Sequence, residues 1–235
     1  MKRMTIKLIT VVAVVIAASA VSAMAGVIDL TFENIAPYPY CDGSCVQIEN
    51  YYNGGTSSIG TSGPNYGISF PDNALLICLN TPGVVCSNTS RGGQGDPNSQ
   101  LGALFFLSGS STFLNDPAGF TTGFSFNYTA INEGGSIQVY SGLNGTGTLL
   151  ASLTLPTTPS DCPSQYDAGF CPFFPIGVTF AGTAESINFG GTANQIVFDD
   201  VTFGSSSPGN APEPASLMLL GSGLIGLATK LRRRR

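Results

Sequence analysis

Two adjacent carboxylates near the end of the chain are best placed to do chemistry. Asp199 alternates with Val197 and Val201 on one apolar face of a predicted strand, with Asp200 beside it. A carboxylate buried there needs a partner, and residues 26–210 contain no lysine and one arginine, so a cation from solvent is the natural one. Calcium, which takes about six to eight oxygen ligands, suits carboxylates and nearby carbonyls. The alternative is that these acids accept backbone N–H bonds or face water.

The composition excludes several other kinds of site. The chain contains no histidine, so Ser-His-Asp and Cys-His catalysis and histidine-containing zinc sites are ruled out. A glycoside hydrolase needs only two carboxylates at a set separation, and four glutamates are available: Glu33, Glu49, Glu133 and Glu185. None of them stands in a recognisable motif. We therefore expect no enzyme, with carboxylate-based glycoside hydrolysis as the alternative.

Tyrosines near the N-terminal loops are candidates for sugar binding. Tryptophan is absent, and the tyrosines expected to be exposed are Tyr38, Tyr40, Tyr51, Tyr52 and Tyr66. A tyrosine ring presents an apolar face and a polar tip, so it can stack on a sugar ring and hydrogen-bond at its edge. Tyr51, Tyr52 and Tyr66 are the predicted stacking residues. The alternative is that they cover an edge of the core.

The elements that would position these residues are strands. Residues 26–204 are rich in Gly and Pro and contain short alternating apolar runs, such as Phe124, Phe126 and Tyr128. Ten to twelve such strands predict an all-β fold, an antiparallel β-sandwich of the jelly-roll kind. Asn144-Gly145 predicts a hairpin, because Asn-Gly tolerates positive φ. Residues 56–67 and 87–100 are predicted loops, where binding sites often lie.

Six cysteines are predicted to form local disulfides. The spacing pairs Cys41 with Cys45, Cys78 with Cys86 and Cys162 with Cys171, each across a Gly- or Pro-containing turn. An exported chain favours paired cysteines, although the sequence alone allows other connectivities. Thiolate metal binding is disfavoured because no C-x-x-C pair is present.

Both ends of the chain have the pattern of targeting segments. A basic start, an apolar run and Ala23-Met24-Ala25 predict a signal peptide over residues 1–25, removed by signal peptidase. At the other end, a Ser/Pro/Gly linker over residues 205–211 leads to Pro212-Glu213-Pro214, an uncharged run and four terminal arginines. That run predicts a short or tilted transmembrane helix whose arginines stay cytoplasmic.

The C-terminal segment, residues 212–235, resembles the PEP-CTERM sorting signal of Gram-negative bacteria that make exopolysaccharide. The resemblance rests on Pro212, Glu213 and Pro214, the apolar run and the basic end, in that order. It implies recognition by an exosortase, a membrane-anchored intermediate in the inner membrane and final placement at the cell surface or in the extracellular matrix. Whether the anchor is removed stays open.

The two ends of the predicted body resemble jelly-roll carbohydrate-binding modules. Phe32-Glu33 in the first strand and Asp199-Asp200-Val201 in the last are similar to segments that lie side by side in those modules and share a structural calcium ion. The resemblance implies a calcium site of Glu33, Asp199 and Asp200. It also implies sugar binding as an alternative function.

The charge distribution completes the prediction. Thirteen of the fourteen carboxylates but only Arg91 among the basic residues lie in residues 26–210, which gives this body a net charge of −12. Such a body repels nucleic acid. We therefore expect an exported, exosortase-sorted, non-enzymatic protein with a structural or binding role at the surface or in the exopolysaccharide matrix.

Overall fold

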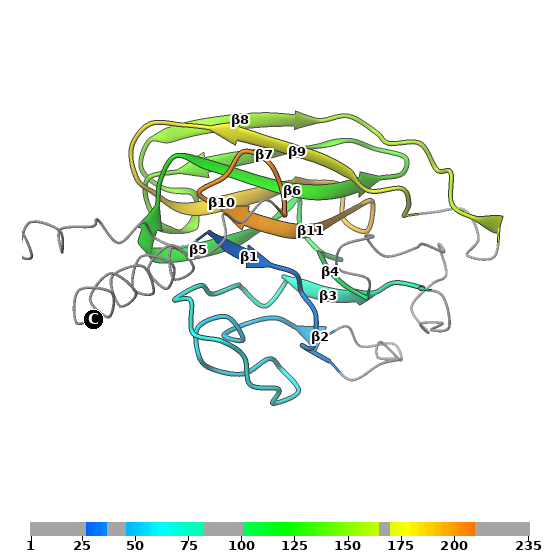
Figure 1. Cartoon of the computed structure of the whole chain (residues 1–235), viewed down its shortest axis with the longest axis horizontal. Coiled ribbons are helices and arrows are strands. Elements are labelled where there is room, and N and C mark those ends of the chain that lie inside the picture. Colours follow the sequence, from blue (N-terminus) through cyan, green and yellow to red (C-terminus); the bar gives the residue numbers. More distant parts are fainter. Residues whose placement is uncertain (1–26, 37–45, 82–100, 165–169, 210–235) are drawn as a thin grey trace, which may run out of the picture.

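The computed structural model describes residues 27–36, 46–81, 101–164 and 170–209. These residues form eleven strands and one short 3-10 helix, and all pairings between the strands are antiparallel. Figure 1 shows the course of the chain. The all-β prediction and the expected ten to twelve strands are therefore confirmed.

The larger sheet has seven strands in the described chain. Its order is β2 (Val46–Gln47), β3 (Leu75–Cys78), β4 (Gly102–Phe105), β11 (Ile196–Phe203), β6 (Gly123–Ala130) and β9 (Phe174–Thr179). The short strand β1 (Ile28–Leu30) pairs with the end of β11, placing Leu30 opposite Val201. The first and last strands of the body are thus neighbours.

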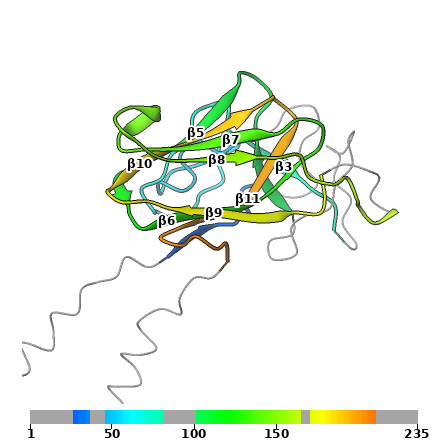
Figure 2. The ribbon, with the colours of Figure 1, turned by 90° about the horizontal axis from the view of Figure 1, so that it is seen from above.

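The smaller sheet has four strands, in the order β5 (Ser111–Phe120), β10 (Ala184–Gly191), β7 (Gly135–Tyr140) and β8 (Leu149–Leu155). Figure 2 shows the two sheets as two layers. Their facing sides are joined by aromatic side chains: Phe189 of β10 lies 6.1 Å from Phe124 and 4.9 Å from Phe198, between ring centroids. Two sheets packed through such a core form a β-sandwich.

The Asn144-Gly145 hairpin is confirmed. It joins β7 to β8 through the short helix η1 (Leu143–Gly145), and φ is +54° at Asn144 and +72° at Gly145. By contrast, the turn at Glu133-Gly134 connects β6 to β7, which belong to different sheets. A turn signal shows that the chain reverses, and tertiary packing decides which sheet receives the next strand.

The outer face of the larger sheet is covered over β6 and β11. A second apolar cluster packs Phe170 with Ile77 and Val197, and every residue of β6 and β11 is buried. Near the other end of β6, the backbone of Ser205 and Ser206 approaches Gly123 and Gly177 so closely that neither glycine has room for a Cβ without displacement. The chain after β11 therefore folds back over β6 and β9.

The predicted signal peptide, transmembrane helix and residues 87–100 lie outside the described residues. Within the described residues, no helix is long and apolar enough to span a membrane.

Candidate functional site

Asp199 and Asp200 lie at a bulge in β11. The register against β6 shifts between Asp199 and Thr202, and Asp200 has φ of +47°. Both side chains are buried, at 0% and 1% exposure. The Asp199 carboxylate accepts the Asp200 N–H at 2.8 Å, and Asn127 Nδ2 donates to the Asp200 carboxylate at 3.0 Å. The two carboxylates therefore have polar contacts within the protein.

Glu33 follows β1 in a turn with positive φ at Phe32 and Asn34. Its Oε1 accepts two backbone N–H bonds, from Leu101 and Gly102, each at 2.7 Å. These bonds tie the turn to the start of β4. Glu33 thus caps backbone N–H groups, which is an alternative to binding a metal ion.

The predicted calcium ligands do not form a three-carboxylate group. Within the described ranges, no cluster of three or more His, Cys, Asp or Glu side chains is placed to hold a metal ion. The donor set is therefore a poor fit for calcium unless backbone carbonyls complete it. Calcium binding by Glu33, Asp199 and Asp200 stays a prediction.

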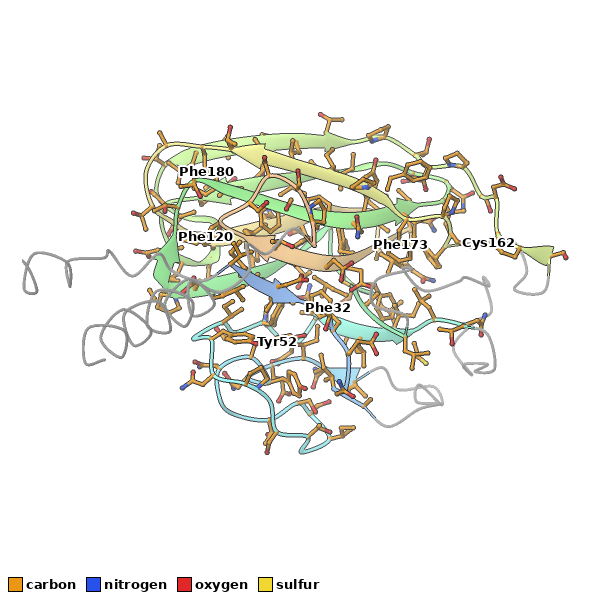
Figure 3. All side chains as sticks on the ribbon, viewed as in Figure 1. Phe32, Tyr52, Phe120, Cys162, Phe173 and Phe180 are labelled. Carbon is orange, nitrogen blue, oxygen red and sulfur yellow. A yellow bond between two sulfur atoms is a disulfide. The ribbon has the colours of Figure 1, made fainter. Side chains whose placement is uncertain are left out.

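The expectation that Tyr51 and Tyr52 are exposed is wrong. Their exposures are 7% and 4%, and both belong to the main core. The Tyr52 hydroxyl accepts the Phe32 N–H at 2.9 Å, and the two rings meet edge to face, as Figure 3 shows. Burial raises the pKa of Tyr52 well above its usual value, so the phenol stays neutral. Aromatic residues in a Gly- and Pro-rich stretch here close one end of the core.

Tyr66 is the one exposed tyrosine of the predicted three. It is 42% exposed, and its ring stacks on Tyr52 at 6.2 Å and 14°. Ile59, in the same predicted loop of residues 56–67, is 44% exposed. Tyr66 thus keeps part of its surface free for a ligand, whereas Tyr38 and Tyr40 lie outside the described residues.

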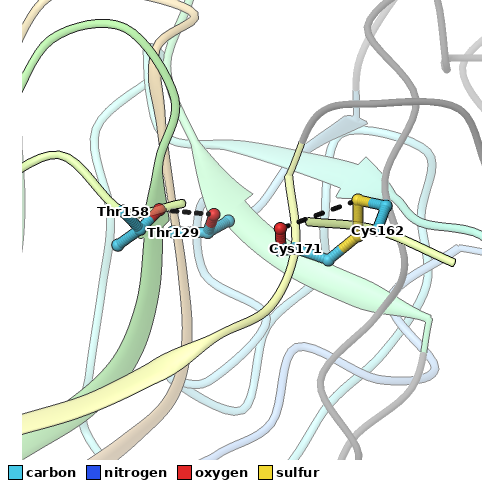
Figure 4. Close-up of a disulfide and its surroundings, with 4 residues drawn as sticks. All are labelled: Thr129, Thr158, Cys162 and Cys171. Atoms are coloured by element: carbon cyan, nitrogen blue, oxygen red, sulfur yellow. Dashed lines mark hydrogen bonds between the residues drawn. A yellow bond between two sulfur atoms is a disulfide. The ribbon is translucent and has the colours of Figure 1, made fainter. Parts of the chain in front are cut away.

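Cys162 and Cys171 form a disulfide, the pair that the spacing predicted, with Cα atoms 5.2 Å apart (Figure 4). The preceding segment is tied to β6, because Thr158 Oγ1 lies 3.1 Å from Thr129 Oγ1 and its N–H donates to the Ala130 carbonyl. Cys78 is also disulfide-bonded. Cys41, Cys45 and Cys86 lie outside the described residues.

The smaller sheet has a polar outer surface that was not predicted from the sequence. Alternate residues of its strands, such as Ile137, Val139, Ile187 and Phe189, are in the core, so the residues between them face away from it. The strand registers align these outward residues in rows across all four strands. The row that we call the amide row contains Phe113, Asn188, Gln138 and Ser152.

Two further rows flank the amide row. On one side lies the small-residue row, Ser111, Gly190, Ser136 and Thr154. On the other side lie Asn115, Ser186, Tyr140 and Leu149, and η1 packs over this third row: Gly145 N–H donates to Ser186 Oγ at 3.0 Å. The polar alternation within Ser136-Ile-Gln-Val-Tyr140 indicated an outward face, but only the strand order brings the rows together.

Comparison with known proteins identifies the C-terminal segment. Residues 210–235 match the PEP-CTERM protein-sorting motif, which includes Pro212, Glu213 and Pro214. The match covers the tail and not the sandwich. A comparison with curated proteins gives no significant match.

Among solved structures, the chain is distantly similar to three. A family 6 carbohydrate-binding module is 21% identical, with 57% of this chain and 95% of that chain covered and a TM-score of 0.33. An arabinoxylan arabinofuranohydrolase of glycoside hydrolase family 43 from Bacillus subtilis is 17% identical, with 63% and 30% covered and a TM-score of 0.34. The K3 cleaved adhesin domain of Lys-gingipain from Porphyromonas gingivalis is 13% identical, with 58% and 93% covered and a TM-score of 0.30. With scores this low, these likenesses carry no argument about function.

Proposed function

We propose that this chain is an exported, non-enzymatic protein of the cell surface or exopolysaccharide matrix, sorted by an exosortase, whose β-sandwich has a structural or binding role. The observation that carries this proposal is the sorting motif at residues 210–235. In this proposal, a signal peptidase removes residues 1–25, the C-terminal helix anchors an intermediate in the inner membrane of a Gram-negative bacterium, and the sandwich, a jelly roll, is delivered outside.

Two properties of the body support this destination. A disulfide joins Cys162 to Cys171, and disulfides persist in oxidising compartments outside the cytosol. The net charge of −12 over residues 26–210 keeps such a body soluble and repels polyanions. A matrix partner of this protein is therefore either a neutral polymer or an anionic polymer that divalent cations link to the acidic body.

The absence of catalysis is part of the proposal. Several carboxylates accept hydrogen bonds from protein groups: Glu33 from backbone amides, Asp200 from Asn127 and Glu133 from the Thr192 hydroxyl. These carboxylates are thus engaged in contacts within the fold. Turnover of a polysaccharide that disappears on replacing one glutamate would contradict this part.

Deletion of residues 212–235 tests the sorting proposal. We expect the truncated protein to leave its normal compartment, either released or retained elsewhere, while its sandwich stays folded. Cell fractionation followed by immunoblotting measures the distribution. A matched control replaces Glu133, at a distance in sequence from the motif, with Gln and keeps normal localisation. Unchanged localisation of the truncated protein would refute sorting by the tail.

A further inference from the structure

We propose that the outer face of the four-stranded sheet binds a neutral polysaccharide chain, which lies across the strands along the small-residue row and against the amide row. This inference rests on the proposed binding role outside the cell and assigns it to a surface.

The face is accessible, unlike the outer face of the larger sheet over β6 and β11. Ser152 and Thr154 of β8 are exposed; the other residues of the two rows are half-buried, except Gly190, which is buried. Among the elements of the described chain, η1 packs on this side, over the third row and against the ring of Phe113 at one end of the amide row. The amide row and small-residue row extend beyond η1. Since neighbouring strands lie about 4.8 Å apart, a row of four side chains spans about 14 Å.

The face carries no charged side chain in either row, although the body as a whole is strongly acidic. The four strands contain two charged residues, Asp116 and Glu185. Asp116 is 4% exposed, and Glu185 lies at the bulge between Ala184 and Ser186, beyond the third row. A neutral polymer can therefore approach the rows without desolvating a charge, whereas a polyanion meets the acidic field of the surrounding body.

The amide row contains two hydrogen-bonding groups, one half-buried and one buried, that have no partner among the described residues. The Tyr140 hydroxyl donates to Gln138 Oε1 at 3.0 Å, which orients the amide, and Gln138 Nε2 has no acceptor in the described parts of the chain. The Asn188 Oδ1 atom is buried and accepts no hydrogen bond from the described residues. A sugar hydroxyl both donates and accepts, so it can satisfy either amide after a small side-chain adjustment.

The two rows also place an aromatic ring beside a row of small side chains. The part of the half-buried Phe113 ring that Gly145 leaves uncovered gives the amide row an apolar surface of the kind that packs against the C–H face of a sugar. In the small-residue row, Gly190 has no side chain and lies between Ser111 and Ser136. The Gln138 amide is already oriented by the Tyr140 hydroxyl, so it loses little conformational freedom when it binds a ligand. The amides and the ring together therefore favour a sugar, which presents hydroxyl groups at its edge and C–H groups on its face.

Native gel electrophoresis of the full-length protein in detergent tests the proposal. Gels contain either of two neutral polysaccharides, hydroxyethylcellulose or xyloglucan, or the anionic polygalacturonate. We expect a neutral polymer to retard the protein and polygalacturonate to leave it unaffected. Gln138→Ala, which removes the free amide donor, should raise the apparent Kd about tenfold, as loss of a hydrogen bond of ordinary strength does. Ser152→Arg, which places a long side chain over the amide row, should abolish retardation.

Matched controls locate the effect. Gln47→Ala makes the same change in β2, and Thr179→Arg adds the same charge to an exposed position of β9, and both should bind normally. No retardation by a neutral polymer, or equal loss in Thr179→Arg, would overturn the proposal. Loss of binding in Tyr66→Ala but not in Gln138→Ala would overturn it by moving the site to the loop of residues 56–67.

Sedimentation velocity tests whether the face binds a second copy of the chain and not a polysaccharide. Self-association of the wild type that Ser152→Arg abolishes would identify the face as a contact between copies, and would overturn the proposal. Melting curves show whether each variant is folded. We expect localisation to be independent of Gln138. If no neutral polymer retards the protein but sorting depends on residues 212–235, the binding face alone is rejected. If localisation does not depend on residues 212–235, the proposed function is rejected.

Discussion

The carboxylate of Glu33 accepts the backbone N–H of Gly102 at 2.7 Å, across 69 positions of sequence. The bond fastens the turn after β1 to the first residue of β4. Gly102 cannot carry a side chain, because a Cβ there would collide with the Phe32 carbonyl. Two strands that are not paired with each other, β1 and β4, are thus joined on the same side of β11.

Glu33→Ala should lower the free energy of unfolding by about 1.5–3 kcal/mol, because hydrogen bonds to a charged group contribute about this much. Glu33→Gln, which keeps one carbonyl acceptor, should cost less. Urea denaturation measures both variants. The control Glu133→Ala removes a carboxylate that is exposed and bonded to Thr192, and should change the stability by less than about 0.5 kcal/mol. Equal effects of Glu33→Ala and Glu133→Ala would contradict the bracing role.

Asp116→Asn should stabilise the protein at pH 7. Asp116 is buried, and burial raises the pKa of its carboxyl from the usual 3.8, with the nearby Glu185 charge adding to the effect. A raised pKa in the folded state means that folding favours the neutral carboxyl. The stability that the neutral Asp116 contributes is therefore complete below the pKa of the unfolded state, and is lost as the pH rises through the pKa of the folded state. Asparagine keeps the Oδ1 acceptor for the Ala118 and Gly119 amides without the charge.

Calorimetry at several pH values measures this effect. We expect Asp116→Asn to raise Tm at pH 7 by about 2–4 °C, the shift that about 1 kcal/mol produces in a domain of this size. The gain should disappear near pH 3, where the wild-type carboxyl is neutral. Asp72→Asn, at an exposed position, is the control and should show no such pH dependence. A gain that is the same at pH 3 and pH 7 would contradict the titration of Asp116.

Tyr52→Ala should destabilise the fold, whereas Tyr66→Ala should not. Tyr52 is 4% exposed and contacts the rings of Phe32 and Phe70, so truncation leaves a cavity that costs about 3–5 kcal/mol. Tyr66 is 42% exposed and loses mainly its contact with Tyr52. Chemical denaturation distinguishes the two, and similar losses would show that the loop of residues 56–67 is part of the core.

Calcium binding by Glu33, Asp199 and Asp200 predicts a Tm that rises with added Ca²⁺ and falls after chelation, because a ligand that binds only the folded state stabilises it. Asp200→Asn should abolish this dependence, and Asp72→Asn should preserve it. Identical melting in Ca²⁺ and in chelator would remove the site, and would agree with the hydrogen bonds that Glu33 and Asp200 make within the protein.

The sequence by itself determined the properties that depend on local patterns. Alternation in segments such as Phe124, Phe126 and Tyr128 specified strands, Asn144-Gly145 specified a hairpin, and the order of residues in the tail specified the sorting motif. Each of these depends on neighbours within a few positions: side-chain direction in a strand, permitted φ in a turn, or a linear recognition signal.

Only the tertiary structure decided what depends on strand order. Tyr51 and Tyr52 lie in a stretch that resembles a loop, yet they close the core, because the segment around them packs against Phe32 and Phe70. Gln138 and Asn188 are 50 positions apart and become neighbours because β7 pairs with β10. Cross-sheet packing and register depend on long-range contacts that periodicity does not encode, so the amide row could not be read from the chain.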